Sequence, residues 1–427
     1  MAVERDGWPV TCNSSCVNNR FFGCQWRFAV VVTNLAFVFL CAAPLGAAAQ
    51  EPQEPLPVPD GYSEPQGFLA EPDPITRATL FADRHLGKGN LNNGLYWDFG
   101  NMVPGAGWLA VGPGYRQWFG RDTMLLDGSI AFSWNGYKTA QARMELPKFA
   151  KSRLALGTQV KWVQFGNIDY FGVGPDTAES ALTTFGIEAT HAVAHATLRP
   201  ARWFNIDGEV GVLSPSLKDG SLGRAGPADD QPLFVPTQVA LTVDTRNFRE
   251  HPTSGILLRG AAAHFEDRDT GAFTHRRYEA QAAAFLPMFG ERVVLALNGM
   301  GAHIPDEESV PFYMLPSLGG ANSLRSFTDY RFHDRNLLLA NAELRLAMMT
   351  HVDLAFFADA GNVAPRFEEL NLDKQSFGGG LRFHTRRQTF ARIDVANGAE
   401  GWRFLFRLTD PLAFKRLERR ATLLVIP

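Results

Sequence analysis

The sequence predicts an all-β fold: a sixteen-stranded antiparallel β-barrel that spans a membrane. Three observations predict it. A segment near the N-terminus has the features of an export signal, and the following chain is built of short segments in which apolar and polar residues alternate. Short and long connections between these segments also tend to alternate. After Gln50 no segment resembles a spanning helix, and only helices and closed barrels satisfy their backbone hydrogen bonds within lipid.

Residues 1–49 are expected to be a signal peptide with an unusually long positively charged region before its apolar core. Arg20 and Arg27 precede the uncharged, mostly apolar residues 28–45. Small residues follow at 47–49, which predicts cleavage between Ala49 and Gln50. The alternative is an uncleaved anchor, because the apolar run is close to the shortest length that spans a bilayer.

The cysteines and the charge balance exclude several classes of function. All four cysteines lie in the first 41 residues, so the exported part offers neither a disulfide framework nor a thiolate nucleophile. The formal net charge is −3, without the basic excess that is typical of proteins that bind nucleic acid. We therefore expect no nucleic-acid partner.

The exported chain is expected to have three parts. Residues 50–92 begin with a segment rich in Pro and Glu and are predicted to be an extended periplasmic linker. Residues 93–410 are predicted to form the barrel. Residues 411–427 form a basic tail, for which the sequence suggests no role.

Alternation at period two is the main evidence for the barrel. In residues 124–134, Ile130 and Trp134 share one face and Asp127 lies on the other. One apolar and one polar face per segment is what a lipid-facing wall around a polar lumen requires, so outer-membrane lipid is an expected partner. The predicted strands are 94–103, 107–119, 122–134, 137–147, 152–165, 181–198, 201–213, 235–246, 254–266, 274–287, 291–303, 334–348, 350–359, 376–385, 388–396 and 401–409.

The connections support a membrane barrel over other all-β folds. Short connections at one end and longer loops at the other are typical of outer-membrane barrels. The stretch 247–253 is an exception, because it is long where a short turn is expected. The alternatives are a soluble sandwich, which would need two domains without a dividing linker, and a propeller, which would need blade repeats that the chain lacks.

The sequence gives no sign of an enzyme, a cofactor or a metal site. His191 and His195 could share a zinc ion on a helix, but they lie on a predicted strand, where they are about 13 Å apart. The glycine cluster 378–380 is followed by neither the helix nor the Lys of a phosphate-binding loop. It is better explained as a strand bend or a point of close approach.

Four segments carry a resemblance to a known family. They are LPSLGGANSLRSF (315–327), NLLLANAELRL (336–346), FFADAGNV (356–363) and FGGGLRF (377–383). Their order over roughly 235–410 resembles the bacterial surface antigen superfamily, which includes the outer-membrane protein assembly factor and the two-partner secretion transporters. Residues 243–255 and 170–175 are also similar to family segments. The family barrel has sixteen strands, in agreement with the count from periodicity.

The resemblance implies a loop before strand 12 that folds into the lumen and is held there by an arginine. The family motif Val-Arg-Gly-Phe/Tyr falls on Leu324, Arg325, Ser326 and Phe327. Its partners on the barrel wall fall on Glu343, Phe357, Asp359 and Gly361. Ser326 stands where the family has glycine, so a position that required a positive φ would be strained here.

Two functions follow as expectations. As a relative of assembly factors, a single-chain barrel in the outer membrane would help to insert or translocate client proteins, opening a weak seam between its first and last strands. The alternative is a passive channel or structural protein with the same fold. Family members carry periplasmic POTRA modules of roughly 75 residues that bind clients by strand addition. Residues 50–92 leave no room for one, which argues against client handling by this chain alone, although a separate periplasmic scaffold could supply that role.

Overall fold

The computed structural model describes residues 67–86, 93–100, 102, 105–107, 109–120, 123–150, 152–222, 231–385 and 388–408. The predicted signal peptide with its Ala49–Gln50 cleavage site, the first part of the linker and the basic tail lie outside these residues.

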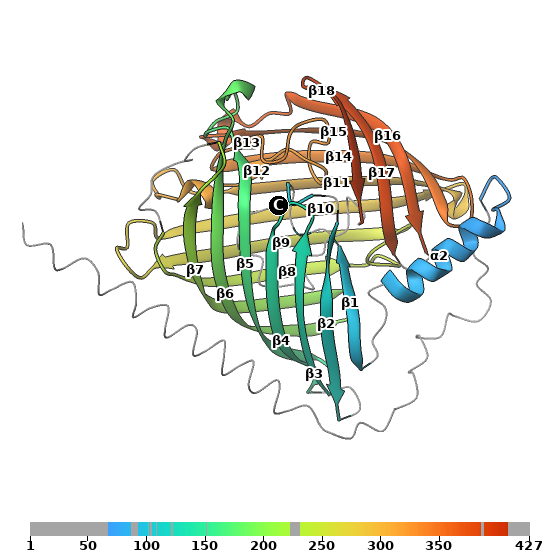
Figure 1. The fold of residues 1–427 in the computed structure, drawn as a ribbon, viewed down its shortest axis with the longest axis horizontal. Coiled ribbons are helices and arrows are strands. Elements are labelled where there is room, and N and C mark those ends of the chain that lie inside the picture. The colour runs from blue at the N-terminus through green and yellow to red at the C-terminus, as the bar shows by residue number, and fades with distance from the viewer. Residues whose placement is uncertain are drawn as a thin grey trace, which may run out of the picture. The chain divides into compact units, whose positions relative to one another are not determined.

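In the described residues, sixteen antiparallel strands form one curled sheet in which neighbours in sequence are neighbours in space (Figure 1). This confirms the predicted strand number and order. The strands are β1 (Gly94–Gly100), β2 (Ala110–Phe119), β3 (Met124–Ser133), β4 (Lys138–Phe149), β5 (Leu154–Tyr170), β6 (Thr183–Ala201), β7 (Phe204–Asp219), β8 (Phe234–Asp244), β9 (Gly255–Asp267), β10 (His275–Met288), β11 (Val293–His303), β14 (Asn336–Ala347), β15 (Val352–Ala364), β16 (Lys374–His384), β17 (Thr389–Gly398) and β18 (Gly401–Arg407).

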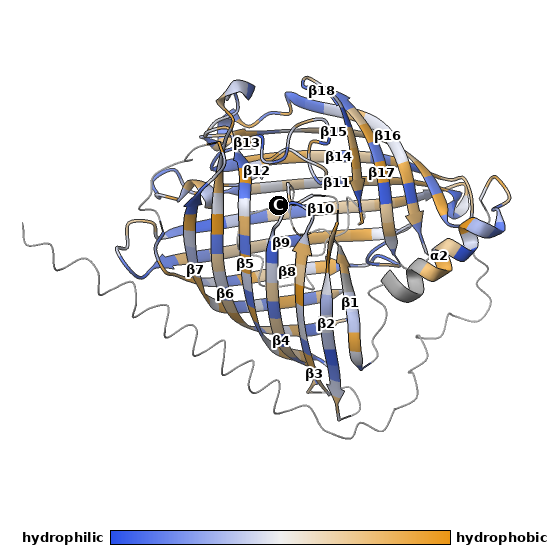
Figure 2. Ribbon diagram, in the orientation of Figure 1, coloured by the Kyte–Doolittle hydropathy of each residue, from blue (hydrophilic) through white to orange (hydrophobic). Residues whose placement is uncertain are grey.

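The outer wall carries the apolar faces that the alternation predicted. Phe132 of β3 and Trp134, just after its end, are 50% and 89% exposed, whereas Asp127 on the opposite face is 2% exposed. Val239 and Leu241 on β8 also face outward. Apolar and polar bands alternate along most strands (Figure 2). An exposed apolar wall of this kind is stable in contact with lipid chains.

The inner wall is not polar throughout, which corrects the simple expectation of a polar lumen. A cluster that includes Phe165, Ile187 and Phe265 of the wall packs with Phe312 and Tyr313 of the connection between β11 and β14. These inward-facing side chains are buried because that connection covers them. An apolar inner surface would be unfavourable in a water-filled pore but is stable under a folded loop.

Part of the expected linker is helical. Helix α2 (Asp73–Leu86) begins at Asp73 with Pro74 next, and both residue types are favoured at a helix N-terminus. Just before it, Phe68 and Leu69 donate backbone hydrogen bonds to the carbonyls of Ala347 and Met348. The helix also contacts β1 and β17. Within the described residues, no helix combines the length and apolar character needed to cross a bilayer.

The long connection 245–254, between β8 and β9, reaches β17 although these strands are far apart in the sheet order. Glu250 forms a parallel bridge with Gln388, and the backbone nitrogen of Thr389 donates to the carbonyl of Glu250 over 3.2 Å. The sequence predicted a short turn here. The additional residues of this longer connection instead cross the end of the barrel.

Candidate functional site

The connection of residues 304–335, between β11 and β14, folds into the barrel. It contains a short 3-10 turn, η3 (Phe312–Met314), and two short strands that pair with each other, β12 (Ser317–Leu318) and β13 (Phe332–His333). Nearly all residues from 311 to 335 are buried. Since β14 is the twelfth strand of the sheet, the predicted inward loop before strand 12 is confirmed. Residues 304–335 are called the lumenal loop below.

Arg325 lies near the tip of the lumenal loop and contacts Asp359 of β15 in three ways. Its Nε donates to Oδ2 over 2.9 Å, its Nη2 donates to Oδ1 over 2.7 Å, and its backbone nitrogen donates to Oδ2 over 3.3 Å. The guanidinium carbon also lies 3.4 Å from the ring centroid of Phe357. Paired hydrogen bonds from one guanidinium to one carboxylate are strong and directional, so they fix the tip of the loop against β15.

Glu343 of β14 is shared by three arginines. It accepts from Nη1 of Arg325 over 2.8 Å, from Nε of Arg345 over 2.9 Å and from Nη2 of Arg382 over 2.8 Å. Arg382 of β16 in turn donates to Asp394 of β17 over 2.5 Å. The structure therefore brings together the expected residues Arg325, Glu343 and Asp359.

The charged cluster extends beyond the residues that the sequence suggested. Arg392 of β17 donates to Asp394 over 2.9 Å, and also to the carbonyl of Ala321 in the loop over 2.6 Å. Arg382 lies in the family-like segment 377–383, whereas Arg392 and Asp394 lie outside the four segments that carry the resemblance. A signal for them existed, because alternation places Arg392 and Asp394 on one face of their strand.

This lumenal charge cluster is almost wholly removed from solvent. Each member is at most 2% exposed, and the members are Arg325, Arg345, Arg382, Arg392, Glu343, Asp359 and Asp394. Burial alone would lower the pKa of Arg325, but the charges and hydrogen bonds of Asp359 and Glu343 outweigh it and hold that pKa above its ordinary value. Arg325 therefore stays charged wherever the protein is folded.

Ser326 fits its site without backbone strain. Among the described residues, four other than glycine have a positive φ, and Ser326 is not one of them. Its backbone nitrogen donates to Oγ of Ser376 over 2.9 Å. A side chain on Gly398 of β17 would meet Oγ of Ser326 at 2.1 Å, so the serine occupies space left by that glycine. The backbone strain that serine would suffer at a positive φ is therefore absent at position 326.

The remaining motif residues pack around the same contact. Leu324 and Phe327 belong to an apolar cluster with Leu318 of the loop. On the wall, a side chain at Gly361 would meet Cδ1 of Leu318 at 3.2 Å and the carbonyl oxygen of Leu338 at 2.6 Å. Gly361 therefore gives space to the loop.

The glycine cluster has a related role. A Cβ on Gly378 would meet Cζ of Phe357 at 2.7 Å, and one on Gly380 would meet Oδ1 of Asp394 at 2.3 Å. The cluster leaves room for the charged groups and the aromatic ring under Arg325. This explains the close approach that the sequence suggested at 378–380.

A second arginine anchors the other end of the lumenal loop. Arg331 donates to Oε1 of Glu400, in the turn between β17 and β18, over 2.5 Å, and to Oγ1 of Thr177 over 2.8 Å. Its guanidinium lies 4.7 Å from the ring centroid of Phe171. Nearby, the backbone nitrogen of Gly174 donates to the carbonyl of His333 over 2.8 Å. Residues 170–175, which resembled a family segment, thus pack on the loop.

Comparison with known proteins agrees with this architecture. Residues 128–404 match the Omp85 superfamily domain. The fold is similar to BamA from Haemophilus ducreyi lacking POTRA domains 1–3, with a TM-score of 0.58 and 16% identity over 74% of this chain and 69% of that one. It is also similar to CdiB from Escherichia coli, with a TM-score of 0.52 and 12% identity over 74% of this chain and 62% of that one. No curated protein matches the sequence.

The match extends over more than half of the chain and includes the lumenal loop and its partners on the wall. The two structural likenesses, at low identity, show that the fold is shared. The chain therefore belongs to the Omp85 superfamily, as a β-barrel protein of the bacterial outer membrane.

Proposed function

We propose that this barrel assists the insertion or translocation of other proteins at the bacterial outer membrane. The observation that carries the proposal is the lumenal loop, which is buried inside the barrel and anchored at Arg325. Because the barrel's own chain fills its interior, that interior is a poor route for small solutes. The strands of the wall can still pair with other chains.

The loop is held at two places, so its position inside the barrel is fixed by contacts with the wall. Arg325 binds to β15 through Asp359, and Arg331 binds to Glu400 beside β18. Arg403 of β18 donates to the carbonyl of Phe327. The loop thus contacts the last hairpin of the sheet directly. A change at the last strand could in this way be coupled to the position of the loop.

The first and last strands, β1 and β18, are consistent with a seam at which client chains pair. β1 and β18 each have 7 residues, whereas the other fourteen strands of the sheet have between 10 and 19. Among the described residues, β1 pairs with β2, β18 pairs with β17, and no pairing joins β1 to β18. A strand edge with unsatisfied backbone groups is a template for pairing with another chain.

The partners we propose are client proteins that arrive in an unfolded state, and a periplasmic scaffold that delivers them. Client strands would add to a free edge of β1 or β18 by main-chain hydrogen bonds. The lumenal charge cluster serves in this account to position the loop. We propose no reaction at that cluster.

Depletion of the protein tests the proposal. We expect the amounts of specific outer-membrane proteins to fall, as measured by quantitative proteomics of isolated outer membranes. The wild-type chain should restore these amounts. Arg325→Ala, produced at the same level, should restore them only in part. Arg366→Ala should restore them fully, because that exposed arginine pairs with Glu369 in the connection after β15 and not with the loop anchor.

The passive channel is the other outcome of the same experiment. An unchanged outer-membrane proteome, together with reduced uptake of small solutes on depletion, would exclude assisted insertion and favour a channel. Single-channel conductance of the purified barrel separates the two further. A loop-filled barrel should show small and infrequent openings, and a stable open pore in the wild-type chain would contradict the proposal.

A further inference from the structure

We infer that His251, Asp353 and His384 form a binding site for a divalent transition-metal ion, with Zn²⁺ as the preferred ion. The three residues come from separate elements: His251 from the connection 245–254, Asp353 from the start of β15 and His384 from the end of β16. One potential ligand atom of each lies within 4.8 Å of the others. Two imidazoles and one carboxylate are a ligand set that suits such metals.

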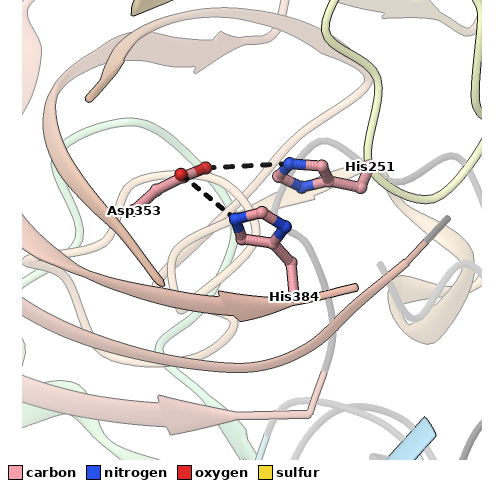
Figure 3. Close-up of side chains that lie close together, drawn as sticks. All are labelled: His251, Asp353 and His384. Atoms are coloured by element: carbon pink, nitrogen blue, oxygen red, sulfur yellow. Dashed lines mark hydrogen bonds and ion pairs between the residues drawn. The ribbon is translucent and has the colours of Figure 1, made fainter. Parts of the chain in front are cut away.

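Both histidines turn a ring nitrogen toward the carboxylate of Asp353 (Figure 3). Nε2 of His384 lies 3.1 Å from Oδ1 of Asp353, and Nε2 of His251 lies 3.7 Å from Oδ2 of the same carboxylate. Ligand atoms around a tetrahedral zinc ion with bonds of about 2.0–2.1 Å are roughly 3.3–3.5 Å apart. These two separations lie on either side of that value, and all three ligand atoms lie within 4.8 Å of one another, so small side-chain adjustments would bring them around one ion.

The other ring nitrogens are already held. Nδ1 of His384 lies 3.2 Å from the carbonyl of Thr385, which can only accept a hydrogen bond, so in the neutral ring Nδ1 carries the hydrogen and Nε2 keeps its lone pair. Nδ1 of His251 lies 3.0 Å from Oγ1 of Thr389. Metal-binding histidines are characteristically oriented by a hydrogen bond from the second nitrogen. Both histidines therefore present Nε2 toward the carboxylate.

Burial and space favour an ion over a loose surface cluster. The three residues are between 4% and 8% exposed and border a cavity of about 40 Å³. A water molecule needs a cavity of roughly 10–15 Å³, so an ion and a water ligand both fit. The protein would supply three ligands and the water a fourth, which is the coordination number that zinc prefers.

Two features limit the affinity. The rings of His251 and His384 are stacked, with centroids 3.9 Å apart and planes 10° apart, so they must tilt before both lone pairs point at one ion. Arg345 also lines the cavity, and its positive charge opposes a cation, although Glu343 neutralises part of it. We therefore expect a dissociation constant in the micromolar range and not the much tighter binding of zinc-finger sites.

An ion at this site would tie the connection 245–254 to β15 and β16. That connection already reaches β17 through Glu250. Metal binding would thus fasten the segment that spans the end of the barrel. The site lies in the part of the molecule that faces α2, since His351, which pairs with Glu71, lines the same cavity. This inference is independent of the proposed function.

Zinc titration of the purified full-length barrel in detergent, after removal of metals by chelation, tests the site. We expect one Zn²⁺ per chain by isothermal titration calorimetry and elemental analysis, and binding unaffected by excess Mg²⁺, which prefers oxygen ligands. Zn²⁺ should also raise the temperature at which the compact, fast-migrating gel form is lost. Co²⁺ in place of Zn²⁺ should give the visible spectrum of a four-coordinate ion.

Variants locate the ion. His251→Ala, His384→Ala and Asp353→Asn should each weaken binding at least about tenfold and abolish the thermal shift, because each loses a ligand. His264→Ala, an exposed histidine on β9, is the matched control and should bind as the wild type does. The fast-migrating form checks that each variant is folded. No zinc binding by the wild type, or undiminished binding by folded ligand variants, would overturn the inference.

Discussion

Arg325 and Asp359 are joined by two parallel side-chain hydrogen bonds, from Nε to Oδ2 over 2.9 Å and from Nη2 to Oδ1 over 2.7 Å, in a site from which water is excluded. Glu343 keeps two other arginines as partners, so Asp359 is the carboxylate that depends most on Arg325. This relationship decides how the loop anchor should respond to substitution.

Arg325→Ala should destabilise the barrel by about 3–5 kcal/mol, because it leaves the carboxylate of Asp359 buried with Asn341 as its remaining side-chain partner among the described residues. The measurement is the temperature at which the fast-migrating gel form is lost. Asp359→Asn in the Arg325→Ala background should recover part of the loss, since no unpaired charge remains. Arg366→Ala, at an exposed pair, should change stability by less than about 1 kcal/mol. Equal effects of Arg325→Ala and Arg366→Ala would exclude an energetic role for the anchor.

Gly398→Ala should destabilise the barrel by about 1–3 kcal/mol, because the added methyl group would collide with Ser326 and with the carbonyl of Gln375. Ser326→Gly should rescue part of that loss and should itself be nearly neutral, since Oγ of Ser326 is buried without a hydrogen-bond partner in the described part of the chain. Thermal loss of the fast-migrating form measures all three variants. A lack of rescue would mean that Ser326 does not rest against β17.

Arg331→Ala should release the part of the lumenal loop that lies against the β17–β18 turn, because it removes charged hydrogen bonds to Glu400 and Thr177 worth about 2–3 kcal/mol in total. Protease added to intact cells should then cut within residues 304–335 faster than in the wild type. Arg335→Ala provides a comparison within the same loop, at hydrogen bonds to the carbonyls of Pro305 and Glu308. Identical cleavage of Arg331→Ala and wild type would contradict the role of Arg331.

The attachment of α2 should depend on pH through Glu71. Burial alone would raise the pKa of Glu71, but hydrogen bonds from His351 and Thr76 outweigh it and hold that pKa below 4.5. A carboxyl with a lowered pKa in the folded state stabilises that state fully above pH 4.5 and progressively less as the pH falls through the lowered value. A spin label on Ala78→Cys should therefore become more mobile in acid.

Glu71→Gln is the control for that titration. Its label should be more mobile than the wild type's already at pH 7, with no further transition between pH 5 and the acid limit of the barrel. The account fails if the wild type and Glu71→Gln show the same acid transition, because the titrating group would then be a different one.

The strands could be predicted because their signal is local. Ile130 and Trp134 face outward in the structure as their spacing indicated, and the described residues form the sixteen strands that were expected. Strand ends were harder: β7 continues to Asp219, beyond the predicted end at residue 213. Residues 214–219 are held in the strand by pairing with β6. The residues of β7 themselves do not reveal how far that pairing continues.

The anchor could be suggested only through a family resemblance. Nothing in the spacing of Arg325 relative to Asp359 shows that the loop turns inward. Asp394 and Arg382 escaped attention because they meet across β16 and β17, where the register decides which side chains are neighbours. The cluster of His251, Asp353 and His384 was missed for a similar reason, since a turn must cross the end of the barrel to assemble it.

Helix α2 was missed for a different reason. The Pro and Glu content of residues 50–73 led us to extend the linker to residue 92, although residues 73–86 contain no further helix breaker after Pro74. Leu80 and Phe81 interrupt the polar composition of that stretch and could have indicated a helix. The average composition of residues 50–92 conceals the change from a Pro- and Glu-rich segment to a helical one.

Site-specific photo-crosslinking in living cells tests the central claim most directly. A photoreactive amino acid at Leu95 of β1 or Phe404 of β18, which are 84% and 61% exposed, should give covalent adducts with newly exported outer-membrane proteins. The same group at Val239 of β8, which is 52% exposed on the far wall, should give none. If the edge positions give no protein adducts, or the same adducts as Val239, the claim that clients engage this barrel at its edge is wrong.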